Sequence, residues 1–143
     1  MIGLDTNILV RYLAQDDPKQ SPRATEIIEQ KISKESPGFI SCVVLVETVW
    51  TLMRSYKMES KDIMAIIKEF IHADDLQLEH REEVWRAHQL VFSQGLDFSD
   101  ALLGAIHHSH GCEYTLTFDQ GAAKSDLFRA ALEIPPGKAL PLF

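Results

Sequence analysis

Four acidic side chains are the residues of this sequence that best suit catalysis. They are far apart along the chain and each lies beside an apolar stretch: Asp5, Glu47, Asp100 and Asp119. Two carboxylates about 5 Å apart, at an effective dielectric near 20, repel each other by roughly 3 kcal/mol. Four converging carboxylates would therefore need a cation. Mg²⁺ or Mn²⁺ suits such oxygen ligands, whereas Zn²⁺ prefers His and Cys. A bound ion of this kind promotes phosphodiester hydrolysis, because it activates water and polarises the phosphate.

Taken singly, three of these acids also have a structural explanation. Asp5 follows a short apolar run and Asp119 follows residues 113–117, so either could be the N-cap of a helix. Glu47 is different, because it interrupts the apolar stretch 43–50. We expect it to be buried or nearly so, and an unpaired buried carboxylate is costly. The alternatives for Glu47 are an exposed stripe or a buried ion pair, and we favour metal binding or catalysis.

Asp97 and Asp100 lie three residues apart, at the start of an expected helix. This spacing resembles a capping box with Asp in place of Glu, and both charges would also suit the positive end of the helix dipole. We expect Asp97 to be structural and Asp100 to belong to the site. Thr117, two residues before Asp119, either supports the acids through its hydroxyl or is an ordinary threonine on the face of a strand.

The hydrophobic pattern predicts strands that alternate with helices. The strands are expected at 2–5, 39–41, 76–78 and 113–117, and the helices at 7–14, 19–35, 42–56, 60–71, 82–94, about 97–110 and about 120–131. This alternation is typical of an α/β fold with a central, mostly parallel sheet of four to five short strands and helices on both faces. Sites in such folds lie beyond the carboxyl ends of the strands, where Asp5 and Asp119 fall.

The length and composition limit the number of domains, the partners and the compartment that we expect. A chain of 143 residues favours one domain, spanning 1–143. Its net charge of -7 argues against a non-specific DNA-binding protein, yet leaves room for a nuclease whose cations offset the acids and for a basic partner. The sequence has no signal-peptide pattern and no apolar run long enough to span a membrane, so we expect a cytoplasmic protein with no membrane partner.

Several short stretches together resemble the motifs of one nuclease family. They are Leu4-Asp5-Thr6-Asn7, Val46-Glu47, Asp97-Phe98-Ser99-Asp100-Ala101-Leu102 and Thr117-Phe118-Asp119. In this order and at this spacing they resemble the PIN domain, from residue 2 to about 134. The size and the opening of the chain resemble the VapC-type toxins of bacterial and archaeal toxin–antitoxin pairs.

The resemblance implies a fold, a cofactor and partners. It implies a PIN-like α/β fold and an endoribonuclease that cuts single-stranded RNA with Mg²⁺ or Mn²⁺. The four acids would ligate the metal, Asn7 and Thr117 would be supporting polar groups, and Asp97 a possible outer acid. A cognate antitoxin and a homodimer are the implied partners. The Pro-rich tail, residues 135–143, departs from the final strand that the family has.

Two other functions remain open. One is a phosphatase-like hydrolase with Asp5 as its nucleophile. It would require a second acid two residues later, where this chain has Asn7, and would leave Glu47 without a role. The other is a catalytically inactive interaction module with the same fold.

Some further residues have plainer interpretations. Trp50 and Trp85 occupy positions typical of a helix core, and the histidines at 107, 108 and 110 suit the end of a helix. Arg11, Arg54, Lys57 and Lys61 are candidates for RNA phosphate contacts or for a solvated face.

Overall fold

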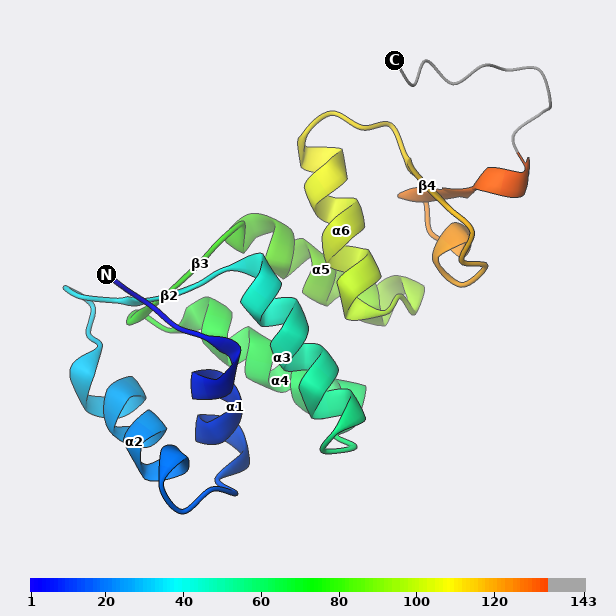
Figure 1. Cartoon of the computed structure of the whole chain (residues 1–143). Coiled ribbons are helices and arrows are strands. Elements are labelled where there is room, and N and C mark those ends of the chain that lie inside the picture. The colour runs from blue at the N-terminus through cyan, green and yellow to red at the C-terminus, as the bar shows by residue number, and fades with distance from the viewer. Residues whose placement is uncertain (134–143) are drawn as a thin grey trace. The chain divides into compact units, whose positions relative to one another are not determined.

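The computed structural model describes residues 1–133, and the Pro-rich tail at 135–143 lies outside them. The chain folds as two compact units, Met1–Trp85 and the residues from Arg86 onward. Each unit contains its own parallel sheet and its own helices, which Figure 1 labels. The two units are described separately below.

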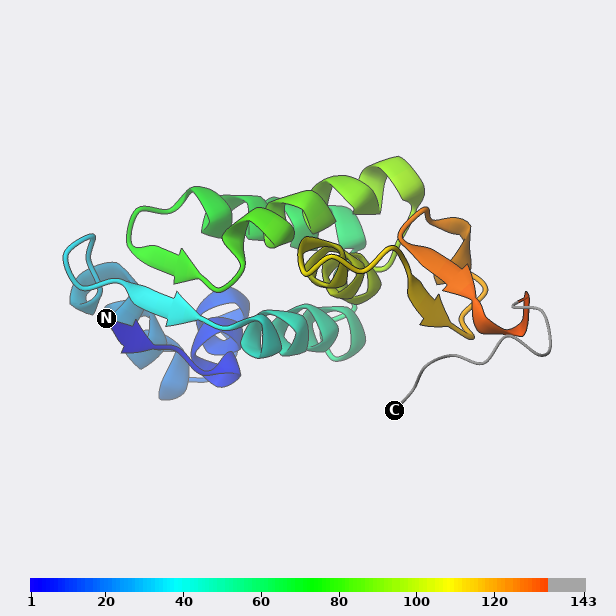
Figure 2. The ribbon, with the colours of Figure 1, turned by 90° about the horizontal axis from the view of Figure 1, so that it is seen from above.

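The first unit is built on a three-stranded parallel sheet. Its elements are β1 (Ile2–Gly3), α1 (Thr6–Ala14), α2 (Gln20–Glu26) with a π-helical segment (Ile27–Lys31), β2 (Gly38–Ile40), α3 (Cys42–Arg54), α4 (Ser60–His72), β3 (Leu76–Leu78) and the start of α5 (Arg81–Gln94). The strand order is β1-β2-β3, and Gly38 pairs with both Ile2 and Leu76. Figure 2 shows the three arrows pointing the same way.

Local sequence explains most of these boundaries. α1 and α2 are separated around Asp17-Pro18, as expected. Ser41 begins α3, because its Oγ accepts a hydrogen bond from the Val44 amide at 3.3 Å. The apolar stripe of α4 is buried as its helical spacing predicts: Ile63, Met64, Ile67, Phe70 and Ile71.

The second unit contains the rest of α5, α6 (Phe98–Ser109), β4 (Thr115–Thr117), a 3-10 turn (Ala122–Lys124), β5 (Phe128–Ala130) and a second 3-10 turn (Ala131–Glu133). β4 and β5 form a two-stranded parallel sheet. Gly95 and Gly111, just after α5 and α6, have φ of 66° and 93°. This left-handed region suits glycine, so both helices end where the sequence predicts.

The predicted α/β class is confirmed, because helices alternate with short parallel strands. Among the described residues, however, the strands are paired in two sheets, of three and two strands, rather than in one. The helix expected at 19–35 ends at Lys31, before a turn in which the Ser33 amide donates to the Ser36 carbonyl at 3.0 Å.

The helix expected at about 120–131 is wrong. Asp119 accepts hydrogen bonds from the amides of Gly121 and Ala122, which makes a tight turn where a longer helix was expected. Residues 128–130 then alternate buried, exposed and buried, and pair with β4. A period of two is the pattern of a strand, and it prevails over the helix-forming alanines around it.

The two tryptophans are not core residues. Trp50 is 55% exposed and Trp85 is 39% exposed. The cores lie elsewhere: Leu9, Leu45 and Leu52 are almost fully buried in the first unit, and Phe98 and Leu102 in the second. Across residues 1–133, none of the helices combines the length and the apolar character needed to cross a lipid bilayer.

Candidate active site

Asp5 lies between β1 and α1, at the carboxyl end of a strand of the parallel sheet. Its backbone is extended, and its Oδ1 accepts a hydrogen bond from the Thr6 amide at 2.8 Å. Asp5 therefore caps α1, as the structural interpretation of this residue predicts. Its side chain is exposed, so capping does not remove it from solvent or from a ligand.

Glu47 meets the residue next to Asp5. The Thr6 hydroxyl donates a hydrogen bond to Glu47 Oε2 at 2.8 Å, which joins the start of α1 to the second turn of α3. The expectation that Glu47 is buried is wrong, because its side chain is exposed. α3 buries Leu45, Val49 and Leu52, and its other face, which carries Glu47 and Trp50, is open.

Thr6 is a site residue that the sequence reasoning missed. In the sequence it is only the neighbour of Asp5. The hydrogen bond to Glu47 spans 41 positions along the chain, so nothing in the local pattern indicates it. Only its position directly after Asp5, an acid at the end of a strand, could have indicated Thr6.

Asn7 occupies the first turn of α1 and is exposed. It lines a surface groove of this unit together with Arg11, one turn further along the same helix. Its side chain is thus two residues from Asp5 and faces a hollow on the surface.

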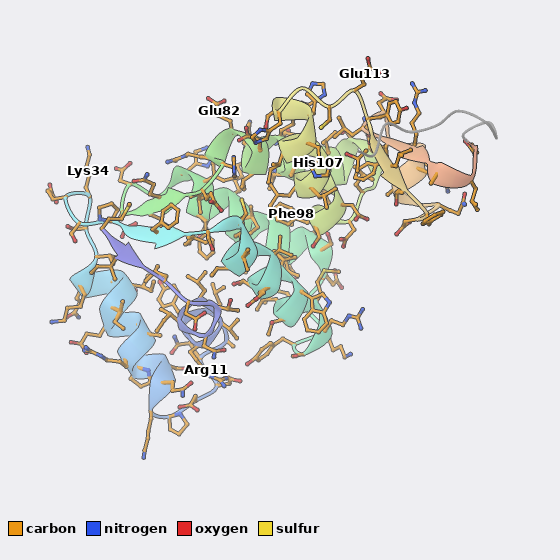
Figure 3. The ribbon with its side chains drawn as sticks, turned by 45° about the horizontal axis from the view of Figure 1, so that its top comes forward. Arg11, Lys34, Glu82, Phe98, His107 and Glu113 are labelled. Atoms are coloured by element: carbon orange, nitrogen blue, oxygen red, sulfur yellow. The ribbon has the colours of Figure 1, made fainter. Side chains whose placement is uncertain are left out.

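In the second unit Asp97 and Asp100 lie at the start of α6. Asp97 has the extended backbone of an N-cap residue but makes no side-chain capping hydrogen bond. The capping-box interpretation therefore fails at this end, and the Asp97 carboxylate is not used to hold the helix. Figure 3 marks Phe98, which follows Asp97 and is buried. Asp100 stands two residues later, and its side chain is half-buried.

Asp119 follows β4 and its carboxylate lies near α6. Its Oδ1 accepts from the Gly121 amide at 2.8 Å and the Ala122 amide at 3.1 Å. The Thr117 hydroxyl accepts a hydrogen bond from the Asp119 amide at 3.0 Å, which holds the acid at the strand end. β4 is joined to α6 by His107, whose Nδ1 lies 2.8 Å from Thr115 Oγ1. His107 lies in the last turn of α6, as expected, and its contact with Thr115 was not foreseen from the sequence.

The surroundings of Asp100 include the charges of the two other acids of this unit. Burial raises the pKa of Asp100 above its ordinary value, and the charges of Asp97 and Asp119 raise it further. Like charges that raise a pKa must lie close enough to interact, so α6 and β4 bring Asp97, Asp100 and Asp119 into one neighbourhood.

The predicted residues therefore form two groups, one in each unit. Asp5 and Glu47 are linked through Thr6 in the first, and the charges of Asp97 and Asp119 act on Asp100 in the second. Within residues 1–133, no three Asp, Glu, His or Cys side chains are positioned as ready ligands of one metal ion.

A comparison with protein families identifies the family of this chain. Residues 2–126 match the family model of the PIN domain. The chain belongs to the PIN domain family. PIN domains are generally nucleases, so the chain is of a hydrolase kind. Among curated proteins, none matches this sequence.

The match runs through both units of this PIN domain and includes all four of the predicted acids. PIN nucleases typically use divalent metals. The acids of each unit fit such an ion in their chemistry, because carboxylate oxygens are the ligands that Mg²⁺ and Mn²⁺ prefer. Burial raises the pKa of Asp100, and the charges of Asp97 and Asp119 raise it further, so a cation bound beside it would favour its charged form.

Proposed function

We propose that this PIN domain is a metal-dependent endoribonuclease that cleaves single-stranded RNA and acts as the toxin of a VapC-type toxin–antitoxin pair. The observation that carries the proposal is the family match over 2–126, a range that includes Asp5, Glu47, Asp100 and Asp119. The charge cluster around Asp100 supports it, because such a cluster favours a bound cation.

In this proposal the four acids hold Mg²⁺ or Mn²⁺, and Asp97 stands just outside them. When bound, the ion activates water and polarises the scissile phosphate. The polar groups around the acids hold them in position. The Thr6 hydroxyl orients Glu47, and the Thr117 hydroxyl and the turn amides at 121 and 122 orient Asp119. Hydrolysis without a covalent intermediate leaves 5′-phosphate and 3′-hydroxyl ends.

A cleavage assay tests the activity. The full chain is incubated with end-labelled single-stranded RNAs in Mg²⁺, in Mn²⁺ and in EDTA, and Asp5→Asn is compared with Asp62→Asn. Asp62 is an exposed acid of α4 outside the site, so it is a matched control. We expect metal-dependent cleavage that Asp5→Asn abolishes and Asp62→Asn preserves. Cleavage that survives both EDTA and Asp5→Asn contradicts the proposal.

The same experiment separates the alternatives. Hydrolysis of phosphomonoesters with a trapped phosphoryl group on Asp5 would indicate the phosphatase-like enzyme. Absence of cleavage over a broad RNA panel at saturating metal would indicate the inactive interaction module.

The toxin role requires a test in cells. We propose the cytoplasm as the compartment, because the proposed RNA substrate is found there. Induced expression of the chain should arrest growth, and Asp5→Asn should not. Sequencing of RNA ends shortly after induction identifies the target. Co-expression with the cognate antitoxin should relieve the arrest, and light scattering on the purified chain tests the proposed homodimer.

A further inference from the structure

An exposed indole lies on the open face of α3. Trp50 is 55% exposed, although α3 buries other apolar side chains, Leu45 and Leu52 among them. Val43, two turns earlier on the same face, is 68% exposed. An indole is the largest apolar side chain, so leaving it in water forgoes the stabilisation that its burial would supply. Such a surface indicates a binding role for this face of α3.

The indole lies beside one of the proposed metal acids. Glu47 and Trp50 are three positions apart on α3, and side chains at this spacing lie about 5–6 Å apart at their Cβ atoms. Glu47 is also exposed, and the Thr6 hydroxyl holds its carboxylate by donating to Oε2 at 2.8 Å. A molecule that covers the indole therefore reaches the Glu47 carboxylate as well.

Arg54 lies over the same ring. Its guanidinium carbon is 5.1 Å from the centroid of the Trp50 ring, a distance typical of a cation–π contact. Within residues 1–133 it forms no ion pair, so no acid neutralises its charge there. Arg11 and Arg23, by contrast, each pair with an acid. A guanidinium held against a ring keeps N–H donors available for a phosphate.

These side chains together fit a nucleotide. Single-stranded RNA presents unstacked bases, which stack on aromatic side chains, and phosphates, which pair with arginine. Arg54 lies one turn after Trp50 on α3, and Glu47 lies one turn before it. A base on the indole would therefore have one phosphate near the guanidinium and the next near the ion that is proposed at Glu47.

A protein partner fits the same face less well. An apolar surface packed on Trp50 would remove the charges of Glu47 and Arg54 from water, which is costly unless each gains a partner. A second copy of the chain would also cover the carboxylate that the proposed reaction needs. RNA uses the indole and the guanidinium and leaves Glu47 to the metal ion.

We infer that Trp50 stacks a base of the single-stranded RNA substrate beside Glu47, and that Arg54 contacts a phosphate of the same nucleotide. The inference rests on the proposed nuclease function, which it deepens by naming residues that position the substrate. Every base has a π face, so this contact holds the strand without reading its sequence.

The first test measures RNA binding. Fluorescence anisotropy of a labelled 12-nucleotide single-stranded RNA of mixed sequence is recorded for the full chain and its variants in Ca²⁺, which has the charge of Mg²⁺ but a looser geometry. A gel verifies that the RNA stays intact, and thermal melts verify that each variant is folded. Trp50→Leu removes the aromatic face, and Trp50→Phe keeps a smaller one. Trp85→Leu is the matched control, because Trp85 is the other tryptophan and lies on α5.

We expect Trp50→Leu to bind RNA about tenfold more weakly, which is the size of one lost base–aromatic stack. Trp50→Phe should retain most of the affinity, and Trp85→Leu should bind like the unmodified chain. This order separates stacking from apolar contact, because leucine is also apolar. Unchanged affinity in a folded Trp50→Leu variant overturns the inference, and so does an unmodified chain that binds no RNA.

The salt dependence tests Arg54. Arg54→Gln should make the slope of log affinity against log salt shallower by about 0.7, the contribution of one phosphate contact on a single strand. Lys68→Gln, which removes an exposed cation from α4, should leave the slope unchanged. Equal slopes for the two variants contradict the phosphate contact of Arg54.

The fluorescence of Trp50 gives a test that needs no change at Trp50. The chain has two tryptophans, so Trp50 is the only indole in the Trp85→Phe variant. A stacked base should quench its emission when the 12-nucleotide RNA is added. An abasic oligomer with the same number of phosphates should not. Equal quenching by the two oligomers overturns the base stack.

Light scattering tests the competing occupant. A dimer that Trp50→Leu converts to a monomer, with RNA affinity unchanged, would assign this face of α3 to a second copy of the chain and overturn the inference. The same oligomeric state in both chains, with weaker RNA binding by the variant, supports the stack.

The inference and the proposed function fail separately. RNA binding that depends on Trp50, in a chain that cleaves no RNA, supports the stack and contradicts the nuclease. Metal-dependent cleavage by a chain whose Trp50→Leu variant binds RNA normally has the reverse meaning.

Discussion

The two acidic groups of this PIN domain are built differently. In the first unit Glu47 is exposed and accepts a hydrogen bond from the Thr6 hydroxyl, and Asp5 is tied to the start of its own helix. In the second unit Asp100 is half-buried and is repelled by Asp97 and Asp119. Asp119 accepts hydrogen bonds from two backbone amides, but Asp100 lies half-buried beside two like charges.

This difference indicates that the two acidic groups have different roles. A carboxylate that is already hydrogen-bonded and solvated gains orientation from its neighbours. A half-buried carboxylate beside two others is less stable when charged, and a cation is the simplest way to compensate it. We therefore expect the second unit to respond more strongly to metal, and the first to be more sensitive to the loss of its hydrogen bond.

The largest expected effect is on cleavage. Asp100→Asn and Asp5→Asn should each lower the rate of RNA hydrolysis by roughly 10²–10³-fold, because each removes a charged oxygen from the proposed site. Asp126→Asn is the control in the second unit, since Asp126 is exposed and outside the acid group. Rate constants measured under single-turnover conditions test this. Equal activity in Asp100→Asn and Asp126→Asn would remove the second unit from the mechanism.

A smaller loss is expected when Thr6 is changed. Thr6→Val removes the donor to Glu47 at nearly constant volume and should lower activity by about 10–100-fold. Thr6→Ser keeps a hydroxyl and should restore most of it, which separates the hydrogen bond from packing. Full activity in Thr6→Val would show that the hydrogen bond from the Thr6 hydroxyl to Glu47 is not needed.

Metal binding should stabilise the fold. At a concentration 100 times the dissociation constant, Mg²⁺ or Mn²⁺ adds about 2.7 kcal/mol to the free energy of unfolding. Thermal melts with each ion and with EDTA measure this shift. We expect it to disappear in Asp100→Asn and to persist in Asp126→Asn. A shift of the same size in Asp100→Asn would show that the ion binds elsewhere.

The smallest effect concerns pH in the metal-free protein. The pKa of Asp100 is higher in the folded chain than its ordinary value, so the folded state holds the proton more tightly. Stability therefore falls as pH rises from the ordinary aspartate range through the raised pKa, and stays lower above it. Asp100→Asn lacks this loss. Denaturant unfolding in EDTA at a series of pH values should show the variant gaining stability relative to the unmodified chain across that window. Parallel curves would contradict the repulsion at Asp100.

The sequence by itself determined most of the local structure of this protein, although not the segment at 120–131. Alternation of short apolar runs with helical stretches predicts the α/β class, and the ordered acidic motifs predict the PIN family, which the match over 2–126 confirms. Asp5 as a helix cap, the break around Asp17-Pro18 and the helix ends at Gly95 and Gly111 also follow from nearby residues. Each depends on backbone preferences and hydrogen bonds that act over a few positions.

Only the tertiary structure decided which side chains meet and which are exposed. The Thr6–Glu47 hydrogen bond, the exposure of Glu47 and Trp50, the pairing of β5 with β4 and the charge cluster around Asp100 all depend on elements distant in sequence. Burial and electrostatic repulsion depend on every neighbour in space, and a one-dimensional pattern does not contain those neighbours.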